Sequence, residues 1–244
     1  MNELKRLKDF QKALATYGIS EESLRILKQT HLVLLLAPTS AGRNTLIRQL
    51  LKTGEYSYII SDTTRKPRVN DGVMEQNGVE YWFRSEDEVL EDLKKGNYLE
   101  AEIIHNQQVS ATPIREIQKA YEANKIAITD IDLGGMLKIL SVKPDTIAVL
   151  LLPPNFEEWQ RRIKHRGPMD AAEFRRRLET ATTIYATALE NDHFTFVSND
   201  TIDHATEQVH HLAKLGVPLP EEQEAGRRLA EQLYIETQTL LKNL

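Results

Sequence analysis

The feature that most constrains this chain is a continuous apolar run, residues 32–36 (LVLLL), followed at once by a loop of small residues. A run without polar alternation is typical of a strand that helices cover on both faces of a parallel sheet. After Ala37-Pro38 the loop reads Thr39-Ser40-Ala41-Gly42, and an amphipathic segment with leucine and isoleucine at helical spacing then runs to Gly54. Strand, small-residue loop and helix in this order are the context of a phosphate-binding loop.

The loop matches the consensus of phosphate-binding loops only in part. That consensus is G-x-x-x-x-G-K-[ST], and here it would span residues 37–44. Gly42 matches, but Ala37 replaces the first glycine, Arg43 the lysine and Asn44 the hydroxyl residue. Taken alone, the pattern fits an ordinary strand-to-helix turn equally well. The rest of the chain has to decide between the two.

Composition narrows the class of protein. The chain has 244 residues, of which 41% are hydrophobic and 27% charged, as in one globular domain or one domain with an inserted lobe. It has no cysteine, which excludes disulfides, thiol nucleophiles and cysteine-ligated metals. The first ten residues are too charged for a secretory signal, and no apolar run approaches the roughly 20 residues of a membrane span. We therefore expect a cytoplasmic protein with no membrane partner.

The charge distribution points to a small anionic ligand. A net charge of -5 argues against a general nucleic-acid binder. Cations are nevertheless concentrated in two places, at Arg65-Lys66-Pro67-Arg68 and between residues 161 and 177. Two arginines three residues apart can present their planar forks to one phosphate. An RNA-binding role for the second cluster is disfavoured, because no aromatic platform accompanies it.

The order of expected elements predicts a doubly wound α/β domain with additions. The expected buried strands of the main sheet are residues 32–36, 58–61, 126–132, 147–152 and 194–197. Between residues 62 and 124 the chain changes to short strands (80–83, 98–104) and an acidic helix (85–95), which indicates an inserted lobe. Residues 1–30 form a helical extension expected to pack on the main domain (31–216), and 217–244 form a helical tail.

Polar residues follow two of these expected strands. Asp130 and Asp132 stand at the end of one strand, and Asn199 follows another. Ligands of open α/β sheets bind outside the carboxyl ends of the strands. The two aspartates are therefore expected in the same crevice as the loop at Gly42.

With these pieces in order, the chain resembles the guanylate kinase family over roughly residues 31–214. The resemblance rests on six sequence motifs, which follow one another in the order of the family: Ser61-x-Thr63-Thr64-Arg65-x-Pro67-Arg68, Asn77-Gly78-Val79-Glu80-Tyr81-x-Phe83, Tyr98-Leu99-Glu100, Asp130-Ile131-Asp132, Arg162-x-x-x-Arg166-Gly167 with Arg177, and Asn199-Asp200. It implies a P-loop kinase-type parallel sheet, a nucleoside-monophosphate-binding lobe at 62–124 and a lid at about 163–178.

The family resemblance also implies roles for individual residues. Ser61, Arg65, Arg68 and Tyr81 would hold the phosphate of a nucleoside monophosphate, Glu100 would accept hydrogen bonds from guanine, and Asp132 would lie near the acceptor and the metal. ATP, the implied phosphoryl donor, would bind at Thr39, Ser40, Ala41, Gly42, Arg43, Asn44 and Thr45, with Asn199 at the adenine. Arg43, Arg162, Arg166 and Arg177 would be catalytic, and Asn44 would be a ligand of Mg²⁺.

Several departures from the family pattern leave two hypotheses open. Residues 106–112 (NQQVSAT) lack the tyrosine that the family pattern has after the Glu100 motif, and Gly134 replaces a glutamine of that pattern. The first hypothesis is ATP-dependent, in-line phosphorylation of a nucleoside monophosphate, GMP to GDP first of all, with activity reduced by Arg43 and Asn44. The alternative is a catalytically impaired domain that binds a nucleotide or a protein. The lid arginines favour the first hypothesis, and the altered loop favours the second.

Overall fold

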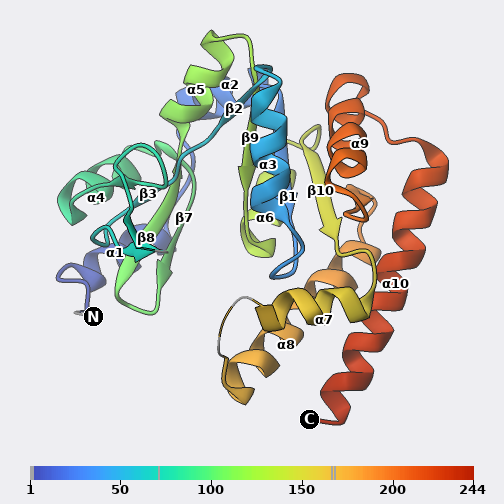
Figure 1. Ribbon diagram of the computed structural model, residues 1–244. Helices are drawn as coiled ribbons and strands as arrows, with labels where there is room; N and C mark the ends of the chain where they lie inside the picture. The colour runs from blue at the N-terminus through green and yellow to red at the C-terminus, as the bar shows by residue number, and fades with distance from the viewer. Residues whose placement is uncertain (1–2, 71, 166, 168) are drawn as a thin grey trace. The chain divides into compact units, whose positions relative to one another are not determined.

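The computed structural model describes residues 3–70, 72–165, 167 and 169–244 (Figure 1). The chain divides into two compact units. One, which we call the lobe unit, falls within residues 1–31 and 57–127. The other, the sheet unit, comprises residues 32–56 and 128–244. The chain passes from one unit to the other three times, after His31, Tyr56 and Ala127.

The central sheet has five strands in the order β11-β10-β1-β9-β2. β1 pairs in parallel with β10, and β10 with β11. Every residue of β1 and β10 is buried, since α6 packs on β1 and α9 on β10 and β11. The elements are β1 (Leu32–Leu36), α3 (Arg43–Lys52), β2 (Tyr56–Tyr58), β9 (Ile126–Asp130), α6 (Leu133–Val142), β10 (Ile147–Leu152), α7 (Phe156–His165), α8 (Ala171–Leu189), β11 (Phe194–Ser198), α9 (Ile202–Leu215) and α10 (Pro220–Lys242).

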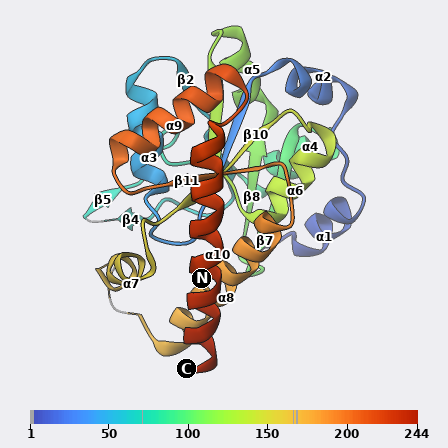
Figure 2. The same cartoon turned by 90° about the vertical axis from the view of Figure 1, so that its right-hand side faces the viewer.

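The C-terminal helix α10 covers the edge strand β11 and lies along α8 (Figures 1 and 2). An edge strand exposes backbone groups that would otherwise pair with another chain. Here the Gln223 side chain takes the place of a neighbouring strand: its Oε1 accepts from Phe196 N (3.0 Å) and its Nε2 donates to Phe194 O (2.9 Å). Gly226 allows the close approach, since a Cβ there would lie 2.6 Å from Phe196 O. The tail predicted at 217–244 is thus an integral part of the sheet unit.

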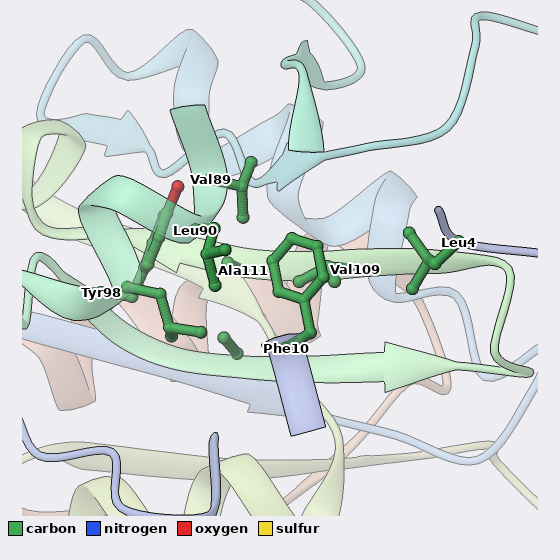
Figure 3. Packing of buried hydrophobic residues seen from close by; sticks show 9 residues of the cluster. Leu4, Phe10, Val89, Leu90, Tyr98, Val109 and Ala111 are labelled. Carbon is green, nitrogen blue, oxygen red and sulfur yellow. The ribbon is translucent and has the colours of Figure 1, made fainter. Parts of the chain in front are cut away.

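The lobe unit holds a four-stranded sheet, β6-β3-β8-β7, and a two-stranded hairpin, β4-β5. Helix α1 packs on α4 and β7, and α2 packs on α5. Phe10 of α1 is fully buried in a core with Val89, Leu90, Tyr98 and Val109 (Figure 3). The elements are α1 (Leu7–Ala15), α2 (Glu21–Gln29), β3 (Asp62–Thr63), β4 (Val69–Asn70), β5 (Val73–Met74), β6 (Trp82–Phe83), α4 (Glu86–Lys94), β7 (Tyr98–Ile104), β8 (Gln108–Pro113) and α5 (Ile114–Glu122).

One strand was predicted in the wrong place, and β8 was missed. The strand expected at 58–61 is β2, at Tyr56–Tyr58. Asp62 and Thr63 pair with β8 in the lobe sheet, so the backbone leaves the central sheet before it reaches them. β8 itself was not predicted, because its small and polar residues carry little strand propensity. It follows β7 after a tight turn of three residues, in which His105 and Asn106 both take positive φ and Gln107 N donates to Ile104 O (3.0 Å).

Candidate active site

The loop between β1 and α3 depends on one glycine. Gly42 has φ +100° and is the N-cap of α3, and its carbonyl accepts from Thr45 N (3.0 Å) and Leu46 N (3.1 Å). A side chain at this φ is strained, and a Cβ would also lie 2.2 Å from Nδ2 of Asn199. Glycine is therefore favoured at this consensus position for two reasons, the positive φ and the close approach of Asn199. Helix N-termini that follow such loops bind anions through backbone N–H groups and the helix dipole.

Two distant side chains hold the carbonyls of this loop. Trp159 of α7 donates from Nε1 to Thr39 O (2.8 Å), and Asn199 donates from Nδ2 to Ala41 O (2.7 Å). Both side chains are buried. Asn199 was predicted at the adenine; here its amide is bonded to the phosphate loop. Ser40 has a positive φ of 64°, and its Oγ is buried without a hydrogen-bond partner among the residues that the structure describes.

Arg43, the residue in the lysine position, forms an ion pair at the end of β9. Its Nη2 lies 3.2 Å from Asp130 Oδ2, and its Nη1 lies 3.5 Å from Ile131 O. The loop at Gly42 and Asp130 do meet at the carboxyl end of the sheet, as predicted. Asp132 instead caps α6, where its Oδ1 accepts from Gly135 N (3.0 Å). Asp130 ends β9 and Asp132 follows it, but the two aspartates contact different partners.

The loop has few side-chain oxygens that could bind a metal ion. Asn44 and Thr45 are exposed on the first turn of α3, and Ser40, earlier in the loop, has a buried Oγ. In the described part of the chain, no group of three or more His, Cys, Asp or Glu residues could hold a metal ion. Mg²⁺ requires few protein ligands when substrate phosphates and water supply the rest. The oxygens of the loop therefore fit a Mg²⁺ ion held mainly by a nucleotide.

Each described lid arginine is held by a glutamate one helical turn earlier. Arg162 donates from Nε to Glu158 Oε1 (2.8 Å), and Arg177 donates from Nε to Glu173 Oε1 (2.7 Å). Bonds from Arg161 and Arg162 lower the pKa of Glu158 to about 2, so this carboxylate is ionised at neutral pH. Nη1 of Arg177 is buried without a hydrogen-bond partner among the described residues. The third predicted lid arginine, Arg166, lies outside the described residues.

In the lobe unit, a buried carboxylate organises the predicted monophosphate site. Glu75 binds Arg65 through both oxygens, with Nη1 to Oε2 at 2.5 Å and Nη2 to Oε1 at 2.8 Å. The same Oε2 accepts from the backbone N of Arg68 (2.8 Å). The Arg65 guanidinium also lies 4.8 Å from the centre of the Tyr81 ring. Glu75 thus brings Arg65 and Arg68 together, and Arg65 in turn lies against Tyr81. The bonds to Glu75 raise the pKa of Arg65.

The predicted base-binding carboxylate has a hydroxyl partner on the neighbouring strand. Glu100 of β7 lies opposite Thr112 of β8, and Thr112 Oγ1 donates to Glu100 Oε1 (2.8 Å). Thr112 is almost fully buried, whereas Glu100 is only partly so. Ser61 contributes through its backbone, with its carbonyl accepting from Trp82 N (2.9 Å). A carboxylate beside a hydroxyl can accept and donate hydrogen bonds along the edge of a base.

Sequence reasoning missed several of these contacts, and only some carried a signal. The glutamates on α7 and α8 could have been found, since Glu and Arg four residues apart are a known helical pair. Glu75 stands ten residues after Arg65, and Trp159 stands 120 residues after Thr39. No local pattern relates such positions. The predicted site residues form two groups, one in each unit. The sheet unit holds the loop, Asp132, Asn199 and the described lid arginines, and the lobe unit holds the other predicted monophosphate-binding residues, Ser61, Arg65, Arg68, Tyr81 and Glu100.

A parallel sheet whose first strand ends in a small-residue loop that caps a helix defines an α/β domain of the phosphate-loop class. The guanylate kinase family model matches residues 29–214. Guanylate kinase from Leifsonia xyli subsp. xyli is 34% identical over 197 residues, which are 80% of this chain and 75% of that protein. Guanylate kinase from Malacoplasma penetrans is 30% identical over 190 residues, covering 76% of this chain and 93% of that protein. The chain belongs to the guanylate kinase family.

A solved structure supports the predicted fold. The crystal structure of guanylate kinase from Anaplasma phagocytophilum matches with a TM-score of 0.55 and 19% sequence identity, and covers 90% of this chain and 96% of that one. The predicted family and fold class, a doubly wound parallel sheet of the P-loop kinase type, are confirmed. No helix among the described residues is long and apolar enough to cross a lipid bilayer.

Proposed function

We propose that this chain transfers the terminal phosphoryl group of ATP to GMP and releases GDP and ADP. The observation that carries the proposal is the buried Glu75, which holds the guanidinium of Arg65 and the backbone of Arg68 in one place. A carboxylate with so little exposure is stable only when it is fully paired. The pairing keeps Arg65 in one orientation before any substrate arrives, which lowers the entropy lost when a phosphate binds.

Guanine recognition is proposed for Glu100 and Thr112. The N1–H and the exocyclic amine of guanine are both donors, and a carboxylate offers two acceptors for them. Adenine presents an acceptor at N1, which would leave the carboxylate facing a lone pair. The bond from Thr112 fixes the carboxylate across the β7-β8 pair. This arrangement takes the place of the tyrosine-containing segment of the family pattern, and it favours GMP over AMP.

Phosphoryl transfer requires alignment and charge stabilisation from the protein, without a covalent intermediate. The backbone of the loop at Gly42 would hold the phosphates of ATP, and Arg43 would leave Asp130 to contact them. Arg162, Arg166 and Arg177 would neutralise charge on the group in transfer. Asn44 or Ser40 would be the protein ligand of Mg²⁺, which would supply positive charge that stabilises the phosphates. Asp132 would support the acceptor side.

A second candidate function is nucleotide binding with impaired catalysis. The observation that favours it is the ion pair between Arg43 and Asp130, since a paired, flat guanidinium replaces the compact ammonium that usually follows the phosphoryl group. In that case ATP and GMP would bind, but turnover would be absent.

One experiment separates the two candidates. A coupled assay with ATP, Mg²⁺ and each of GMP, dGMP, AMP, CMP and UMP should show turnover with GMP above the others. In parallel, ligand at about 100 times its dissociation constant stabilises by roughly 2.7 kcal/mol, a thermal shift of several degrees for a chain of this size. A thermal shift without turnover would overturn the kinase proposal and leave the binding module.

A further inference from the structure

Trp159 stands at the junction of the phosphate loop with α7 and α8. Its side chain is fully buried, and its Nε1 donates to Thr39 O in the loop (2.8 Å). The indole ring contacts Phe156 of α7 at a centroid distance of 5.9 Å, and Tyr185 of α8 at 6.2 Å, edge to face. Tyr185 is also fully buried. One side chain thus joins three segments of the sheet unit.

The two helices that meet at this ring carry the described lid arginines. Arg162 follows Trp159 by three residues on α7, and Arg177 precedes Tyr185 by eight on α8. Indole combines a large apolar face with a single N–H donor, so it can pack between helices and still bond to a backbone carbonyl. Leucine and phenylalanine would supply the packing without the bond. The loop is therefore tied to α7 by a contact that is specific to tryptophan.

We propose that Trp159 is a positioning residue, which fixes the phosphate loop to the helices that carry the lid arginines, so that binding of a donor nucleotide at the loop is transmitted to them. This inference rests on the proposed function, since it assigns the loop to the donor. Trp159 itself does not contact substrate. Its contribution is to hold Thr39 O, and with it the backbone of the loop, in the geometry that receives phosphates.

The chain offers a matched control for this residue. It has two tryptophans, Trp82 and Trp159. Trp82 lies in the lobe unit, and its Nε1 has no hydrogen-bond partner among the described residues. Trp82→Phe and Trp159→Phe therefore make the same chemical change, and only the second removes a bond to the loop.

Steady-state kinetics of the full chain test the proposal. Loss of one hydrogen bond changes an equilibrium by about three- to tenfold. For Trp159→Phe we expect the KM for ATP to rise and kcat to fall, each by about that factor, while the KM for GMP stays unchanged. Trp82→Phe should retain all three constants. Both proteins are assayed well below their melting temperatures, so that the folded fractions are equal.

Fluorescence supplies a readout that does not require turnover. In Trp82→Phe, Trp159 is the only tryptophan, and its emission should change when ATP or ADP is added and saturate near the KM for ATP. The proposal is overturned if Trp159→Phe matches Trp82→Phe within about twofold in every constant, or if the emission of Trp159 does not respond to ATP. Should Trp159→Phe fail to fold, the emission measurement decides alone. Absence of GMP phosphorylation by the unaltered chain would instead overturn the proposed function.

Discussion

The phosphate loop and the monophosphate-binding region keep the family pattern in different ways. In the lobe unit the side chains match the pattern at Arg65, Arg68 and Glu100, and the buried Glu75 and Thr112 hold them in place. In the loop the side chains at positions 37, 43 and 44 depart from the consensus. Its backbone shape is nevertheless retained, through the positive φ of Gly42 and two bonds from distant side chains.

The difference follows from how each region recognises phosphate. A loop at a helix N-terminus binds phosphate largely through backbone N–H groups, so its side chains can change while its conformation is kept. The lobe recognises phosphate through guanidinium groups, and a planar fork has no substitute among the other side chains. We expect changes of side-chain charge to be severe in the lobe and milder in the loop, where the backbone is the sensitive part.

The largest effect is expected for Arg65→Ala. Removal of a group that pairs with a bound charge costs about 2–5 kcal/mol, so kcat/KM for GMP should fall by roughly 10²- to 10³-fold. The KM for ATP should change little. Lys66→Ala removes an exposed neighbouring cation and should leave activity within about twofold. A loss below about threefold for Arg65→Ala would contradict the assignment of the lobe as the monophosphate site.

Arg65→Ala also removes the ion pair that Arg65 forms with the buried Glu75 carboxylate, so the melting temperature of this variant must be measured beside its kinetics. Glu75→Gln keeps the shape of the side chain and removes its charge. We expect this variant to raise the KM for GMP by about tenfold, since the fork of Arg65 is no longer held by charge-assisted bonds. An unchanged KM would remove Glu75 from the site.

The second prediction tests the backbone of the loop. Gly42→Ala places a side chain at φ +100° and against Asn199, and should destabilise the protein by about 2 kcal/mol or more, which lowers the melting temperature by roughly 4–8 °C. Gly54 has φ +76°, but a Cβ at that position would meet no atom within 4 Å. Gly54→Ala should therefore cost only the backbone strain, about half as much. Equal melting temperatures for the two variants would show that the Asn199 side chain can move away from the new methyl group without destabilising the protein.

The third prediction concerns the side chains of the loop. Arg43→Lys combined with Asn44→Ser restores the G-K-[ST] part of the consensus. We expect kcat to rise about tenfold, because an ammonium cannot make both of the contacts that Arg43 makes at the end of β9, and a hydroxyl is the better Mg²⁺ ligand. Arg48→Lys, on the same helix but exposed, serves as the control. If kcat of the double variant is no higher in a steady-state assay, the departures of the loop from the consensus do not limit catalysis.

The smallest effect is expected from His204, in the sheet unit. Its Nδ1 lies 3.1 Å from Asp200 Oδ1, and its Nε2 lies 3.6 Å from Glu222 Oε1 of α10. The hydrogen bond to Asp200, together with the charge of both carboxylates, raises the pKa of His204. The stabilisation is complete below the ordinary histidine pKa of about 6.5 and is lost as the pH rises through the raised value. The side chain is half exposed, so the change should stay below about 1 kcal/mol.

Urea unfolding at a series of pH values measures this dependence. The free energy of unfolding should decrease slightly as the pH rises from about 6 through the raised pKa, and His204→Gln should remove that part of the slope. A slope of the opposite sign, or one unchanged in His204→Gln, would mean that this histidine does not link α9 to α10. The sheet unit would then owe its pH dependence to other groups.

Local signals in the sequence located most elements. The strands at 32–36, 98–104 and 147–152 have the predicted ends. These predictions succeeded because the apolar pattern of a strand depends on neighbouring residues. β2 and β8 were misplaced or missed, because their pairing depends on which distant strand they meet.

The sequence by itself determined most of the strands and helices, the loop at Gly42 and the family, since all three are carried by residue types at short spacing. Only the tertiary structure decided which side chains support those residues. Trp159 reaches Thr39 across 120 positions, Asn199 reaches Ala41 across 158, and Glu75 turns back to Arg65. Such contacts depend on the path of the chain through the fold, and no local spacing encodes it.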